Sequence, residues 1–282
     1  MTNRAEIMSA MRAKIAAGQP IIGGGAGTGL SAKCSEEAGL DFIVVYNSGR
    51  YRMAGRSSMA GLMPYGDANQ IVMDMGSEIL PVVNRIPVVA GVCGTDPFRM
   101  MPRFLRSVKD AGFSGVQNYP TVCLFEGIIR ANLEETGLGF YKEVEMIAEA
   151  HALDLFTASY VANVDEAVAM ALAGSDVIVP HMGLTTSGMV GAQTALTLAD
   201  AKLKVRELMT AAREVNPDVI VVCHGGPIAS PAEAAEVIRD VEGIDGFLGA
   251  SSMERLPTEV AMVEHMSSYT RINLPARASQ KA

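Results

Sequence analysis

One short pattern recurs four times along the chain and constrains the fold more than any other feature. At residues 38–41, 111–114, 173–176 and 242–245, a glycine is followed within two residues by a short apolar run. Glycine suits a helix end, because it adopts the left-handed backbone of a C-terminal cap without steric cost. The apolar runs do not alternate with polar residues, which is typical of strands buried on both faces of a parallel sheet. The pattern predicts helices alternating with parallel strands.

Four further apolar runs bring the number of predicted strands to eight. Their starts lie about 32 residues apart on average, enough for one strand and one helix each. This size and repeat predict a TIM (β/α)8 barrel, with a doubly wound open sheet as the alternative. The predicted strands are residues 20–23, 42–45, 87–92, 115–117, 153–159, 177–179, 219–223 and 246–248.

Several helix starts can also be predicted from the sequence. Ser230, Pro231 and Glu233 have the spacing of a capping box with proline in the first turn. Asp96 before Pro97 predicts a second capped start, for a helix over residues 98–109. We expect residues 3–17 to form an extra helix under the barrel and residues 275–282 to be a loose tail. No domain boundary is evident, so residues 1–282 are predicted to be one barrel domain.

Composition narrows the class of protein. The chain is 49% apolar and 19% charged, with a net charge of −8. This acidic balance argues against binding to nucleic acid or to an anionic membrane surface, both of which need a basic footprint. No apolar run approaches the ~20 residues of a membrane span, and the charged N-terminus does not resemble a signal peptide. The four cysteines form no CxxC pair, which excludes a thiolate zinc site and a disulfide framework. We expect a cytoplasmic protein.

In a barrel, catalytic and binding residues lie in the loops that follow the strands. The loop after the first strand is glycine-rich and includes Gly24 and Gly25, but it lacks the Lys-Ser/Thr of a P-loop. The glycines have two interpretations: they allow the backbone of this loop to approach a ligand, or they allow it to pack closely against another segment at the barrel mouth. The long segment 46–69 follows the second strand and carries polar and basic residues that suit an anion site, a lid or a subunit contact. These residues are Asn47, Ser48, Arg50, Arg52 and Arg56.

Two of the four histidines lie at the ends of predicted strands: His224 directly follows one, and His181 follows another after Pro180. Two such histidines at one rim indicate a general acid or base, although a histidine at a strand end can also be a hydrogen-bonded core residue. Asn118, after the fourth strand, is a candidate for binding a substrate oxygen. Glu254, after the eighth strand, completes the candidate catalytic set.

Glycines and serines follow the last two strands. Loops of this kind after strands 7 and 8 form the usual phosphate site of TIM barrels, so we expect them to bind a phosphate or carboxylate group. No lysine ends a strand, which argues against a Schiff-base aldolase. The sequence does not determine a cofactor: magnesium is one candidate, but no carboxylate cage for it is evident. The predicted anion-binding residues here are Gly225, Gly226, Gly249, Ser251 and Ser252.

Several long segments resemble the phosphoenolpyruvate hydrolase-like family of TIM barrels. They include YNSGRYRMAGRSSMAGLMPYGDAN, AGVCGTDPF, GFSGVQNYPTV, LEETGLGFYKEVEMI, PHMGLTTSG, CHGGPIASP and GASSMERLPTE. The resemblance covers residues 7–274. It implies a TIM barrel that acts on phosphoenolpyruvate or phosphonopyruvate, and phosphonopyruvate hydrolase is a name that such proteins receive.

Three functions follow from these observations. The first is hydrolysis of a small phosphorylated carboxylic acid, with the arginines and the last two loops binding its anionic groups. The second is a lyase or isomerase reaction on a related acid, because barrels change chemistry through their loops. The third is a non-catalytic barrel that senses a ligand. In each case we expect a small anionic metabolite as ligand. We also expect a homo-oligomer, because the glycine- and methionine-rich loops are more than a monomer's surface easily covers.

Overall fold

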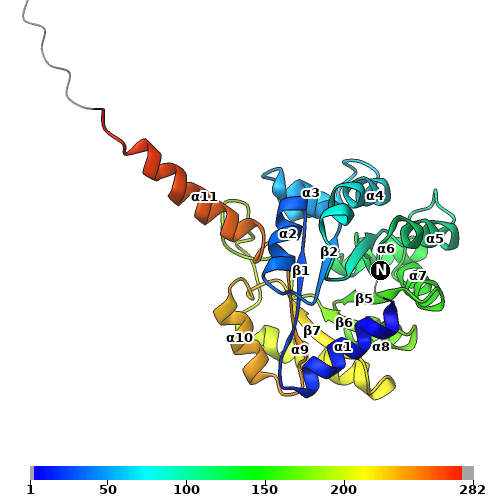
Figure 1. The fold of residues 1–282 in the computed structure, drawn as a ribbon. Coiled ribbons are helices and arrows are strands. Elements are labelled where there is room, and N and C mark those ends of the chain that lie inside the picture. Colours follow the sequence, from blue (N-terminus) through cyan, green and yellow to red (C-terminus); the bar gives the residue numbers. More distant parts are fainter. Residues whose placement is uncertain (1–2, 275–282) are drawn as a thin grey trace, which may run out of the picture.

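Eight parallel strands form a closed barrel in which each strand pairs with the next and β8 pairs with β1 (Figure 1). The computed structural model describes residues 3–274. This closure confirms the TIM barrel and excludes the open sheet. The strands are β1 (Ile21–Gly25), β2 (Phe42–Val45), β3 (Val88–Val92), β4 (Gly115–Asn118), β5 (Phe156–Val161), β6 (Val177–Pro180), β7 (Ile220–His224) and β8 (Gly246–Gly249).

Helices cover the outside of the barrel, and short 3-10 turns lie in three of the connections, η1 and η3 after strands and η2 between α4 and β3. The α-helices are α1 (Arg4–Ala16), α2 (Gly29–Glu37), α3 (Asn47–Met53), α4 (Ala68–Ile79), α5 (Met101–Ala111), α6 (Gly127–Glu135), α7 (Tyr141–Ala152), α8 (Val164–Leu172), α9 (Leu198–Val215), α10 (Pro231–Asp240) and α11 (Arg255–Thr270). The 3-10 turns are η1 (Ser58–Leu62), η2 (Leu80–Val82) and η3 (Val122–Leu124). Within residues 3–274, none of the helices has the length and apolar character needed to cross a bilayer.

The recurring glycines have the backbone that the sequence predicts. Gly39, Gly112, Gly174 and Gly243 have φ angles of 79°, 109°, 86° and 87°. A residue with a Cβ atom is strained in this region, so glycine ends each helix and turns the chain into the next strand. The local pattern therefore sets the alternation of helices and strands.

The N-terminal helix α1 lies under the barrel, at the end where the strands begin, as expected for residues 3–17. Its Arg4 forms an ion pair of 2.7 Å with Asp176, which directly precedes β6. Its Lys14 forms one of 2.6 Å with Asp41, directly before β2. Ile7 and Met11 are its buried residues. The mouth at the opposite end is left free of α1. The predicted tail, residues 275–282, lies outside the described residues.

Two sequence-based boundaries are wrong, each for a local reason. The helix predicted over residues 98–109 begins at Met101, because Asp96 accepts a hydrogen bond from the Phe98 amide and pairs with Arg99 to form a turn. The fifth strand begins at Phe156 rather than at residue 153. Helix α7 reaches Ala152, and the residues after it still form its terminal turns.

Ser230 caps α10 as predicted, with Pro231 in the first turn. Its hydroxyl accepts the Glu233 amide at 3.3 Å. The Glu233 carboxylate does not complete the box, since it accepts the amide of Ala229, one residue before the cap, at 2.9 Å.

Candidate active site

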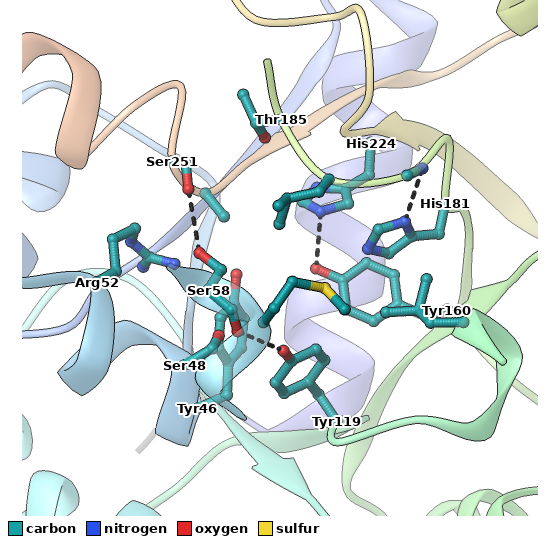
Figure 2. Close-up of a pocket in the computed structure, with 15 residues that line it drawn as sticks. Tyr46, Ser48, Arg52, Ser58, Tyr119, Tyr160, His181, Thr185, His224 and Ser251 are labelled. Carbon is teal, nitrogen blue, oxygen red and sulfur yellow. Dashed lines mark hydrogen bonds between the residues drawn. The ribbon is translucent and has the colours of Figure 1, made fainter. Parts of the chain in front are cut away.

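A cavity of about 230 Å³ opens at the carboxyl ends of the strands (Figure 2). This is the end at which TIM barrels bind their ligands. Its walls come from the ends of β5 and β7 and from the loops after β2, β4, β6 and β8, so residues far apart in the sequence meet there. The lining residues are Tyr46, Ser48, Arg52, Ser58, Met59, Tyr119, Leu124, Tyr160, His181, Gly183, Leu184, Thr185, His224, Ala250 and Ser251.

The two strand-end histidines lie side by side in this cavity, with ring centroids 4.7 Å apart. His224 Nδ1 lies 2.7 Å from the Leu248 carbonyl oxygen, which can only accept, so Nδ1 carries the proton. His224 Nε2 is then free to accept, and the Tyr160 hydroxyl lies 3.3 Å from it. His181 has the opposite tautomer, because its Nδ1 accepts the Gly183 amide at 3.1 Å. The site therefore offers an acceptor nitrogen on His224 and an N–H donor on His181.

Both histidines are neutral at pH 7. Burial lowers the pKa of His224 to about 4, and the nearby Arg52 charge adds to this effect. Burial and the adjacent His224 ring lower the pKa of His181 well below its usual value. A neutral imidazole can accept a proton without first losing one, so His224 is in the state that a general base requires.

Three tyrosines form the aromatic wall below the histidines (Figure 2). The ring centroids of Tyr46 and Tyr119 are 4.9 Å apart, and those of Tyr119 and Tyr160 are 6.2 Å apart. Burial raises the pKa of all three hydroxyl groups. They remain protonated and can donate hydrogen bonds, as Tyr119 does to the Ser58 carbonyl at 3.2 Å.

Arg52 and Glu254 form a fully buried ion pair beside the cavity. Arg52 Nε donates to Glu254 Oε2 at 2.7 Å, and Glu254 Oε1 accepts the Gly27 amide at 2.6 Å. Burial acts to lower the pKa of Arg52, but the Glu254 carboxylate and the Tyr46 hydroxyl outweigh it and the pKa is raised. The guanidinium stays charged and faces the cavity from the side opposite the histidines.

The structure brings five of the predicted site residues to the cavity: Ser48, Arg52, His181, His224 and Ser251. Glu254 lies directly behind the cavity wall as the partner of Arg52. Arg56 is exposed and Arg50 is half-buried, and neither lines the cavity. The other predicted residues that do not line it are Gly24, Gly25, Asn47, Asn118, Gly225, Gly226, Gly249 and Ser252.

Asn118 lies behind the tyrosine wall and links Glu143 to the backbone of Tyr160. Its amide nitrogen donates to Glu143 Oε2 at 2.6 Å and to the Tyr160 carbonyl at 3.1 Å, and its oxygen accepts the Tyr160 amide at 2.7 Å. Glu143 also accepts the Thr121 hydroxyl and the Val122 amide. Burial raises the pKa of Glu143 to about 8. Asn118 and Glu143 therefore position Tyr119 and Tyr160.

The mouth glycines allow backbone segments to pack closely. A Cβ atom on Gly27 would overlap the Gly49 carbonyl, and one on Gly226 would overlap the Met182 carbonyl. The Gly226 amide donates to the Gly183 carbonyl at 2.8 Å. These contacts favour the packing interpretation of both loops. An anion site at Gly225 and Gly226 stays a prediction.

The sequence reasoning missed the three tyrosines. The same rule that identified the histidines would have found them, because Tyr46 and Tyr160 directly follow predicted strands and Tyr119 follows another by one residue. Phenol rings at strand ends are common core residues, which is why they attract less notice than histidines.

The residues at the cavity do not fit a magnesium ion. Magnesium prefers carboxylate and other oxygen ligands, but in the part of the chain that the structure describes no aspartate or glutamate lines the cavity. The nearby Glu254 carboxylate already binds Arg52 and Gly27. Among residues 3–274, no three histidine, cysteine, aspartate or glutamate side chains cluster in a way that could hold a metal.

Solved structures show the same barrel. The crystal structure of 2,3-dimethylmalate lyase, a PEP mutase/isocitrate lyase superfamily member, matches with a TM-score of 0.60 and 17% identity, over 100% of this chain and 93% of that chain. Phosphonopyruvate hydrolase in complex with oxalate and Mg²⁺ matches with a TM-score of 0.57 and 17% identity, over 94% and 87%. The chain thus has the TIM-barrel fold of these hydrolases and lyases.

The chain belongs to the phosphoenolpyruvate hydrolase-like family, whose model matches residues 6–272. Two tomato (Solanum lycopersicum) proteins, the ToMV susceptible protein tm-1(GCR26) and the ToMV resistance protein Tm-1(GCR237), are each 55% identical over 274 residues. The match covers 97% of this chain but 36% of each tomato protein, so the chain spans about a third of their length.

Proposed function

We propose that this barrel is an enzyme that cleaves a small carboxylic acid by proton transfer in the cavity of Figure 2. The observation that carries the proposal is the contact of the Tyr160 hydroxyl with the unprotonated nitrogen of the neutral His224. This pair lies opposite a cationic Arg52, so a proton acceptor and an anion-binding group face one small cavity.

In this proposal Tyr160 and His224 act as a relay. Tyr160 hands its proton to His224 Nε2 while it accepts one from a hydroxyl group of the substrate or from the attacking water. No lasting charge then remains on the buried phenol. The His181 N–H donates to the oxygen on which negative charge develops, a role that a preorganised donor performs well. Hydrolysis and lyase cleavage both need these steps, so the geometry supports both reaction classes.

The family description points to phosphoenolpyruvate, and one structural neighbour is a phosphonopyruvate hydrolase. The first assay therefore incubates the protein with these two acids and with unphosphorylated 2-oxo and 2-hydroxy acids. Proton NMR detects organic products, and a phosphate assay detects release of phosphate. We expect conversion of at least one acid, slowed by about two orders of magnitude in a variant that carries His224→Ala. No conversion of any acid would contradict the enzyme proposal.

The second candidate is a barrel that binds a ligand without turning it over. The names of the tomato relatives support this second candidate, because they refer to susceptibility and resistance to ToMV and name no reaction. A ligand that raises the melting temperature without being converted would support this candidate.

We further propose that the protein is a homo-oligomer assembled through α11. Figure 1 shows α11 running away from the barrel, and Arg255 at its start is its one buried residue. An isolated helix of this length in water is marginally stable, so a packing partner is expected. Its exposed apolar residues are Val260, Met262, Val263, Met266 and Tyr269.

A double variant, Val263→Asp and Met266→Asp, should shift the protein from oligomer to monomer, because two buried charges in an apolar interface are strongly unfavourable. Light scattering at micromolar concentration measures the mass. Ser267→Asp and Ser268→Asp on the same helix form the control. A wild-type protein that is already monomeric would contradict the proposal.

A further inference from the structure

The charge of the cavity is set by one ion pair. Among residues 3–274, Arg52 is the only lysine, arginine, aspartate or glutamate that lines the cavity. Its charge is balanced inside the protein by Glu254, at a hydrogen-bond distance of 2.7 Å. The two lining histidines are neutral at pH 7. The cavity and the wall directly behind it therefore carry a net charge close to zero.

The groups that remain suit one carboxylate. Within the described residues, Arg52 Nη1 makes no hydrogen bond, although it is buried. The hydroxyl groups of Ser48, Ser58 and Ser251 lie around the same side of the cavity (Figure 2). An arginine supported by hydroxyl donors is a suitable partner for a single carboxylate.

Among the described residues that line the cavity, a second negative charge would meet no cation besides Arg52. The charge of Lys204 helps to lower the pKa of His181, but Lys204 does not line the cavity. The opposite wall consists of His181, His224 and the tyrosines, whose rings are neutral. The Gly226 amide, which could otherwise help a phosphoryl group, is bonded to Gly183. Removing an unpaired charge from water is unfavourable, so a dianion is disfavoured relative to a monoanion of the same size.

The shape of the wall adds a second restriction. The rings of Tyr160, His181 and His224 lie within 4.9 Å of one another, centroid to centroid. The three rings are inclined to one another by 46° to 68°, so they offer a planar ligand both ring faces and ring edges, the two geometries that aromatic contacts favour. The net charge of the cavity and the rings of its wall therefore both restrict which ligand can bind.

We propose that the cavity selects a small planar monoanion, a 2-oxo monocarboxylic acid or its enol, and discriminates against phosphorylated acids and dicarboxylates. The inference rests on the proposed function in placing the substrate in this cavity. It differs from the substrates that the family description suggests, because it follows from the charges on this chain's own residues.

The first test compares pyruvate with oxalate, which have nearly the same size and differ by one negative charge. Binding is measured by NMR titration at pH 7.5, with and without Mg²⁺, and phosphonopyruvate is added as a phosphorylated probe. We expect pyruvate to bind at least ten times more tightly than oxalate or phosphonopyruvate under both conditions. Tighter binding of either dianion, or no binding of pyruvate at millimolar concentration, would overturn the inference.

The second test adds a cation to the cavity without breaking the buried ion pair. Met59 lines the cavity and is 44% exposed, so Met59→Lys can be accommodated. This variant should gain tenfold or more in affinity for oxalate relative to pyruvate. Met189→Lys is the matched control, because Met189 is 73% exposed and does not line the cavity. Equal effects of the two variants would show that the cavity charge does not set selectivity.

The two proposals can fail separately. Preferential binding of pyruvate without turnover of any acid would remove the enzyme proposal and leave the charge selectivity intact. Turnover of phosphoenolpyruvate or phosphonopyruvate with release of phosphate would support an enzyme and overturn the selectivity.

Discussion

Replacing Glu254 with alanine is expected to lower the free energy of unfolding by about 3–5 kcal/mol. The substitution leaves the Arg52 guanidinium fully buried without a counter-ion, and it also removes the acceptor for the Gly27 amide. Breaking a buried pair from one side costs this much because the remaining charge has lost both water and partner. Urea denaturation followed by circular dichroism measures the change.

Two further variants test whether the loss of stability comes from the unpaired charge of Arg52. Glu135→Ala removes an exposed carboxylate from α6 and should change the stability by less than about 0.5 kcal/mol. The double variant Arg52→Met and Glu254→Leu should recover much of the loss, since apolar residues of similar volume can replace a buried ion pair. A loss below about 1 kcal/mol in Glu254→Ala would show that water reaches the guanidinium.

Alanine at His224 or His181 is expected to reduce turnover by about two orders of magnitude, the size of a general acid–base contribution. His224→Ala loses activity because it removes the nitrogen that accepts the Tyr160 proton. Tyr160→Phe removes the hydroxyl group of the same contact and should cause a similar loss of turnover. His265→Ala, on the exposed α11, serves as the control. Steady-state rates with the substrate found in the first assay provide the measurement.

Stability separates this catalytic role from a structural one. His224→Ala should cost only about 1 kcal/mol for the lost bond to the Leu248 carbonyl, too little to account for a hundredfold loss of rate at temperatures well below the melting transition. The rate of the wild-type protein should also show no inflection near pH 6.5 from His224. Its pKa is about 4, so it is neutral and able to accept a proton throughout the range above that pH. Full activity in both alanine variants would show that the histidines are core residues.

Much of the fold could be predicted from local sequence. The glycines at 39, 112, 174 and 243 mark helix ends because few other residues adopt their positive φ angles, and that preference acts within a few residues. The same reasoning placed His181 and His224 at the carboxyl ends of strands. It failed at Asp96, where a turn and an ion pair with Arg99 delay the helix.

The candidate site was only partly predictable. Sequence reasoning named Arg50, Arg52 and Arg56 together, but the fold buries Arg52 alone against Glu254. It assigned Asn118 to a substrate, whereas its side chain faces Glu143 behind the wall. Which face of a strand end meets the cavity depends on register, and a shift of one residue reverses it.

The sequence by itself determined the alternation of strands and helices, the glycine-capped turns and the two histidines at strand ends, because short-range backbone preferences and burial patterns encode these features. Only the tertiary structure decided that the sheet closes, that Arg52 meets a carboxylate 202 positions away, and that the histidines and tyrosines share one nearly neutral cavity. These outcomes depend on pairing between β1 and β8 and on packing across the mouth. Contacts between residues so distant in the chain leave no local pattern.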